Sequence, residues 1–136
     1  MNLKIPLNNK TFRENLCLIN QEVFAADGVN RIYLISISRM KLIKDITFDN
    51  YENLNAFCSL NDGKCLLAAC SKRSSKNKNE LRNDLLQYQI NDNNNDFELT
   101  TIIQNETETR KVLSIVYLKK CAIVSGSDDG TVKVWK

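Results

Sequence analysis

Two adjacent aspartates, Asp128 and Asp129, have the residue types and spacing best suited to chemistry in this sequence. A carboxylate pair can hold a metal ion or divide the roles of acid and base between its members. However, aspartate–glycine recurs at Asp27-Gly28 and Asp62-Gly63, in each case between two apolar runs. Because this dipeptide accepts the positive φ of tight turns, we interpret Asp128 and Asp129 as part of a hairpin turn.

Other side chains that support catalysis or metal binding are scarce. The chain of 136 residues has no histidine, which removes the commonest general base and the commonest metal ligand. The five cysteines are odd in number and include no C-x-x-C pair, so we expect reduced, mostly buried thiols in an intracellular protein: Cys17, Cys58, Cys65, Cys70 and Cys121. With no glycine-rich phosphate loop either, we expect a protein that is not an enzyme and has no catalytic, cofactor or metal site.

Composition narrows the class of protein further. A hydrophobic content of 43% is enough for a buried core, and a net charge of +3 is well below that of a dedicated nucleic-acid binder. The N-terminal residues lack the apolar segment of a signal peptide, and no run approaches the roughly 20 apolar residues that span a bilayer. We therefore expect a cytoplasmic protein, with the nucleus as the alternative, and no association with membranes.

The order of apolar runs and turns repeats three times along the chain. Each unit has a short apolar run, a turn, a second apolar run and then alternating runs, which predicts four strands. The second runs are apolar on both sides, as expected of strands covered on both faces: residues 22–26, 65–70 and 121–124. A period of 40–50 residues is typical of propellers and solenoids. The predicted units cover residues 11–50, 51–104 and 105–136.

The last sixteen residues, CAIVSGSDDGTVKVWK (121–136), resemble the core of a WD repeat. Residues 27–33 align without gaps on residues 129–135, with Tyr33 in place of the tryptophan, and Tyr88 takes that place in the middle unit. The resemblance implies an all-β fold: a partial β-propeller of about three four-stranded antiparallel blades, the last without its outer strand. Residues 1–10 are then the outer strand of a preceding or closing blade.

The resemblance also implies a structural hydrogen-bond network of Ser125, Asp129 and Trp135. In it, Trp135 is largely buried and its indole N–H donates to the Ser125 hydroxyl. The family's histidine is missing, and residues 107–109 stand in its place. We therefore expect Asp129 to serve its own turn.

A basic stretch, residues 71–84, lengthens the expected loop between the second and third strands of the middle unit. Its first part carries four cations: Lys72, Arg73, Lys76 and Lys78. A docking loop for a partner, a phosphorylation site, a nuclear localisation signal and a solvated, disordered insertion all fit this composition. We expect residues 72–82 to be mobile and to contribute little to stability.

These patterns favour a non-catalytic scaffold that mediates protein–protein interaction, and they do not identify the partner. One alternative is a fragment of a larger regulatory or cytoskeletal WD-repeat protein whose activity lies outside this chain. Another is an RNA-binding module that uses residues 72–82, although that stretch lacks the aromatic residues on which bases stack. Because three blades do not close a ring, we expect self-association or pairing with missing blades.

Overall fold

The computed structural model describes residues 12–60, 63–74, 76–77, 79–91, 96–105, 111–118 and 122–135. These residues form eleven β-strands in three antiparallel sheets, in which the strand order follows the chain order. In this part of the chain there is no helix long and apolar enough to cross a membrane.

The first sheet contains β1 (Phe12–Leu18), β2 (Val23–Gly28), β3 (Arg31–Ser36) and β4 (Lys41–Thr47). The second sheet contains β5 (Asn53–Leu60), β6 (Cys65–Arg73), β7 (Leu81–Asn91) and β8 (Asp96–Asn105). The third sheet, within the described residues, contains β9 (Val112–Leu118), β10 (Ala122–Ser127) and β11 (Val132–Trp135).

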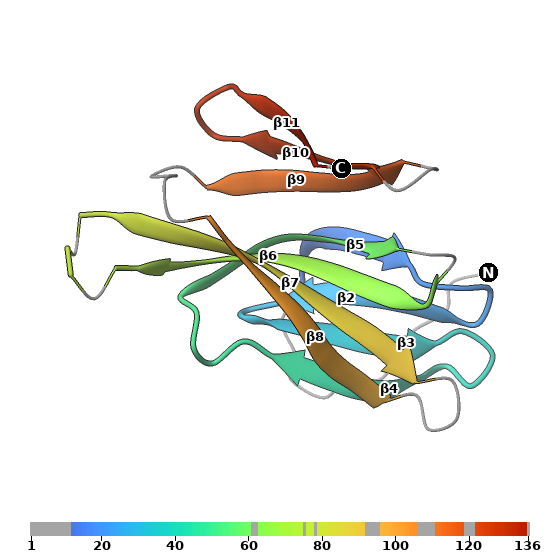
Figure 1. The fold of residues 1–136 in the computed structure, drawn as a ribbon. Coiled ribbons are helices and arrows are strands. Elements are labelled where there is room, and N and C mark those ends of the chain that lie inside the picture. Colours follow the sequence, from blue (N-terminus) through green and yellow to red (C-terminus); the bar gives the residue numbers. More distant parts are fainter. Residues whose placement is uncertain are drawn as a thin grey trace.

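The three sheets stack with the second in the middle, so that this sheet is covered on both faces (Figure 1). One core cluster joins the first and second sheets and includes Leu34, Phe48, Phe57, Leu66 and Leu86. Another joins the second and third sheets and includes Cys58, Leu67, Leu85, Val112 and Ile115. Successive residues of β6 point to opposite cores, which explains why its apolar run does not alternate with polar residues.

The expected all-β class is confirmed, and the described part of the third sheet has three strands where the first two sheets have four. The first strands of neighbouring sheets contact each other, β1 with β5 and β5 with β9. The strand expected near residues 3–7 and the segment 107–109 lie outside the described residues.

The basic stretch differs from the prediction of a long mobile loop. Strands β6 and β7 continue into it, and Ser71, Lys72 and Arg73 pair with Asn83, Arg82 and Leu81. The connection between the strands is confined to residues 74–80, where the Ser74 N–H donates to the Glu80 carbonyl at 2.8 Å. Within this stretch Ser71 and Asn83 pair with each other and are buried although polar, which a count of charges does not detect.

The prediction of a turn at Asp27-Gly28 is also wrong. Both residues belong to β2, and the hairpin turn is Val29-Asn30, where Asn30 adopts a φ of 52°. In the third sheet the turn is one residue longer, because Ser127 bonds to Thr131 and the positive φ of 81° falls on Gly130.

The gapless alignment of Tyr33 on Trp135 therefore fails. Tyr33 pairs with Ala26, whereas Trp135 pairs with Ile123. Counted from the turn, Trp135 corresponds to Ile35, two residues beyond Tyr33.

Candidate partner-binding site

The tryptophan of the third sheet makes the expected hydrogen bond. Trp135 Nε1 donates to Ser125 Oγ at 2.9 Å, and Ser125 is buried. Trp135 itself is only partly buried, contrary to the expectation, because β11 is the edge strand of the described sheet. The Lys133 ammonium lies 5.9 Å from the centre of its ring. Burying the indole completely would need a further element beside β11.

The two neighbouring aspartates hold the turn between β10 and β11. Asp129 Oδ1 accepts from the Thr131 N–H at 2.9 Å and from the Thr131 hydroxyl at 2.6 Å, so it serves its own turn. Asp128 Oδ1 accepts from the Lys111 N–H at 3.1 Å and ties this turn to the start of β9. Both aspartates are exposed. Within the described ranges no three His, Cys, Asp or Glu side chains gather as metal ligands.

The aspartate of the first sheet has a different role. Asp27 is buried at the end of β2, where its two oxygens accept from the backbone N–H and the side-chain amide of Asn15, both at 3.0 Å. This carboxylate therefore attaches β1 to β2 and is not available to a partner.

Sequence reasoning missed the polar centre of the second sheet, which lies around Asp84. This carboxylate is 1% exposed, and it accepts from the Tyr51 hydroxyl at 2.9 Å and from Arg82 Nε at 3.1 Å. The Lys72 ammonium lies 5.0 Å from the centre of the Tyr51 ring, within the range of a cation–π contact. The R-x-D spacing of Arg82 and Asp84 was the available signal, since residues i and i+2 of a strand share a face. The contribution of Tyr51, 33 positions away from Asp84, follows only from the fold.

This environment keeps the neighbouring hydroxyl and thiol protonated. Burial, together with the hydrogen bond to Asp84, raises the pKa of Tyr51. Burial and the nearby Asp84 charge raise the pKa of Cys70. The Cys70 thiol is therefore a poor nucleophile, because the thiolate is the reactive form. At neutral pH the Tyr51 hydroxyl donates its proton to Asp84, and Lys72 and Arg82 supply the positive charge of the centre.

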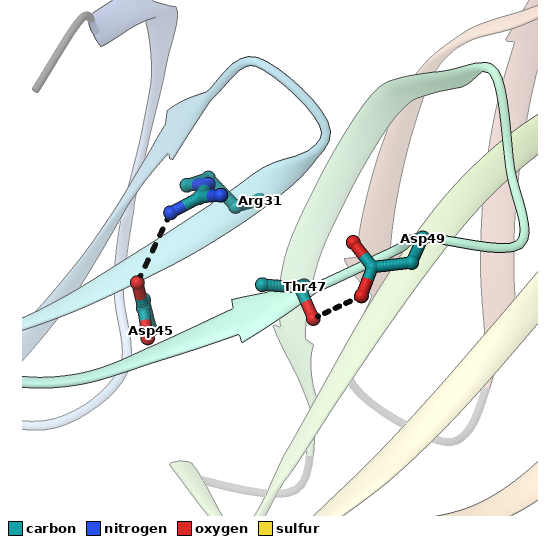
Figure 2. Close-up of polar contacts among 4 residues, drawn as sticks. All are labelled: Arg31, Asp45, Thr47 and Asp49. Atoms are coloured by element: carbon teal, nitrogen blue, oxygen red, sulfur yellow. Dashed lines mark hydrogen bonds and ion pairs between the residues drawn. The ribbon is translucent and has the colours of Figure 1, made fainter.

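The second sheet also carries two adjoining hollows that share Lys72 and Arg82. One hollow, of about 420 Å³, lies between the end of β4 and the outer strands of the second sheet, where Leu99 and Ile102 are exposed. In its wall the Thr47 hydroxyl donates to Asp49 at 3.2 Å (Figure 2). The same view shows the ion pair between Arg31 and Asp45, whose atoms lie 3.3 Å apart and which joins β3 to β4.

The second hollow, of about 430 Å³, follows the hairpin formed by β6 and β7. Its charged lining consists of four cations and one carboxylate: Lys72, Arg73, Lys76, Arg82 and Glu80. We call the two hollows together the basic groove. Its cations include three of the four predicted docking residues; the fourth, Lys78, lies outside the described residues. Arg82, which was not among them, enters through its strand pairing with Lys72.

The basic groove combines positive charge with an exposed aliphatic wall. Such a surface can bind carboxylate or phosphate groups next to apolar side chains, through charge-assisted hydrogen bonds and apolar contact. No protein-family model matches this chain, and a comparison with curated proteins finds no match.

Proposed function

We propose that this chain is a non-catalytic scaffold of the WD-repeat, β-propeller type, which binds an acidic segment of a partner protein in the basic groove. The observation that carries the proposal is the gathering of Lys72, Arg73, Lys76 and Arg82 around the second hollow, where Glu80 is the carboxylate. In the first hollow Asp84 is already bonded to Arg82, and Asp49 accepts from Thr47. The stacking of three sheets, with their first strands in contact, supports the propeller class.

The scaffold role is supported by the way in which the charged groups of the basic groove are already paired. Asp84 accepts hydrogen bonds from Tyr51 and Arg82, and the Tyr51 hydroxyl, whose pKa is raised, keeps its proton in the bond to Asp84. Arg73 already lies 3.6 Å from Glu52, at an exposed position where a partner's carboxylate can compete. Binding of an acidic segment needs no rearrangement of the two strands that carry these cations.

Fluorescence anisotropy with a labelled peptide of twelve glutamates tests this proposal. We expect saturable binding that weakens as salt rises, and a loss of about tenfold or more in R73E/K76E, because electrostatic attraction between exposed charges is screened. The matched control is K41E/K64E, which makes the same charge change at exposed lysines outside the basic groove and should bind nearly as the wild type does.

The RNA-binding alternative is tested with a labelled twelve-nucleotide oligouridine under the same conditions. We expect weaker binding than to the acidic peptide, because the cations of the basic groove are not interleaved with free aromatic faces: the Tyr51 ring is covered by Lys72. Tighter binding of the RNA, lost in R73E/K76E, would contradict the proposal. So would equal binding of the acidic peptide by R73E/K76E and wild type.

A further inference from the structure

The outward face of the third sheet is apolar and open. Val116, Leu118, Val132 and Val134 are 48–71% exposed, and Val124 lies between them on the central strand. We call these five residues the free face. In Figure 1 the third sheet lies at one end of the stack, and the free face is turned away from the second sheet.

The free face of the third sheet is equivalent, by strand register, to one face of the second sheet. That face of the second sheet is the one that packs against the third sheet. In both sheets the register shifts once between the first and second strands. The shift follows Ala69 in the second sheet and Gly126 in the third, so these two residues are equivalent. Counted from that pair, Cys58, Leu67 and Leu85 occupy the positions of Val116, Val124 and Val132. All three are buried against the third sheet.

The first sheet shows the same arrangement. Asp27 pairs with Ile32 one step before the turn region, as Gly126 pairs with Val132, so Ile32 and Leu34 are equivalent to Val132 and Val134. Ile32 and Leu34 are buried in the core against the second sheet. In two of the three sheets this face is therefore covered by another β-sheet, and in the third it is exposed among the described residues.

The free face is suited to contact with itself because it carries no charge. On β11 the charged Lys133 points to the opposite face, where its ammonium lies over the Trp135 ring. An uncharged aliphatic surface has no like-charge repulsion to overcome when two copies meet face to face. Another copy of this chain supplies such a surface at the same concentration as the free face itself.

A head-to-tail contact between copies through the free face is blocked. In such a contact the free face would meet the outer face of the first sheet in a second copy. That face is already buried: Ala26, Tyr33 and Ile35 are 1–3% exposed. Association through the free face therefore stops at two copies related by a twofold axis, because the surface used by each is then consumed.

We propose that the free face binds the free face of a second copy of this chain, forming a closed dimer. Three strands about 4.8 Å apart, over about five residues of about 3.3 Å each, cover roughly 240 Å² of sheet. Standard interfaces bury about 800 Å² per partner. The dimer is therefore weak and reversible.

Sedimentation equilibrium of the full chain from about 5 µM to 1 mM tests the proposal. We expect the weight-average mass to rise from 15.6 kDa towards twice that value. V132K/V134K, which changes side chains more than half exposed, should remain at 15.6 kDa throughout with an unchanged melting temperature. The control V29K/I37K adds the same charge at exposed apolar positions outside the free face and should associate as the wild type does.

A charge-swap experiment shows whether the face meets itself. V132D/V134D should be monomeric alone, but an equimolar mixture with V132K/V134K should associate more strongly than either variant does alone, because the two apposed faces then carry opposite charges. A wild type that stays monomeric at 1 mM, a V132K/V134K variant that still associates, a mixture that remains monomeric, or masses beyond the dimer would each overturn the proposal.

Discussion

The second and third sheets have equivalent strand registers, but they differ in the number of sheets that pack against them. The second sheet is covered on both faces and encloses a polar centre, in which Asp84 is bonded by Tyr51 and Arg82. Among the described residues, the third sheet is covered on one face only, and its aspartates lie in an exposed turn. The same strand order thus yields either a core or a surface, depending on the number of neighbouring sheets.

This difference predicts unequal contributions of like residues to stability. A side chain on the doubly covered sheet loses apolar contact and leaves a cavity when it is shortened, whereas its equivalent on the free face was already in water. A buried carboxylate leaves unpaired donors when it is removed, whereas an exposed one leaves donors that water can satisfy.

The largest effect is expected from Asp84→Ala. This change leaves the Tyr51 hydroxyl and the partly buried Arg82 without their acceptor, so we expect the free energy of unfolding to fall by about 2–4 kcal/mol. Asp129→Ala is the matched control in the exposed turn and should cost about 1 kcal/mol or less. Urea denaturation measures both, and equal losses would remove the contrast between the two sheets.

Leu85→Ala and Val132→Ala probe equivalent ladder positions. Leu85 is 4% exposed and Val132 is 71% exposed. We expect a loss of about 2–4 kcal/mol for the first and less than about 0.5 kcal/mol for the second. Denaturant midpoints at low protein concentration, where the proposed dimer is dissociated, give the comparison. A loss above 1.5 kcal/mol in Val132→Ala would show that the free face is covered in the monomer.

Trp135→Phe should lower the free energy of unfolding by about 1–2 kcal/mol, an intermediate effect. The change removes a hydrogen bond and leaves the buried Ser125 hydroxyl without this partner, while the ring itself is partly exposed. A double-mutant cycle with Ser125→Ala isolates the pair, and we expect a coupling energy of about 0.5–1.5 kcal/mol. A coupling near zero would mean that the bond contributes nothing to the third sheet.

The smallest effect concerns alkaline pH. Burial raises the pKa of Tyr88 to about 12, whereas an unfolded tyrosine titrates near 10. The unfolded chain therefore loses this proton first, so stability is full below about pH 10 and falls as pH rises towards 12. Tyr88→Phe should make the decline shallower between these values, as followed by thermal melts. An unchanged slope would contradict the assigned burial.

Local patterns in the sequence predicted the strands well. The predictions failed where contacts between distant segments determine the local structure. Asp27-Gly28 has the composition of a turn, yet Asn30 accepts the positive φ and Asp27 bonds to Asn15 instead. The charged residues around Lys72 suggested a loop, although their backbone pairing, next to the buried pair of Ser71 and Asn83, extends the strands.

The site was predictable only in part. Three of the four docking cations line the basic groove. Their neighbours Tyr51 and Asp84 come together through the packing of the segment after β4 against β7, which local composition does not encode.

Amide hydrogen exchange, followed by mass spectrometry at low protein concentration, tests most directly whether the third sheet is less stable than the second, which has the same strand order. We expect amides of β9 and β10 to exchange at least tenfold faster than those of β5 and β6, because a sheet covered on one face opens without unfolding the rest. Equal protection of the two sheets would contradict this account and would mean that the third sheet unfolds together with the second.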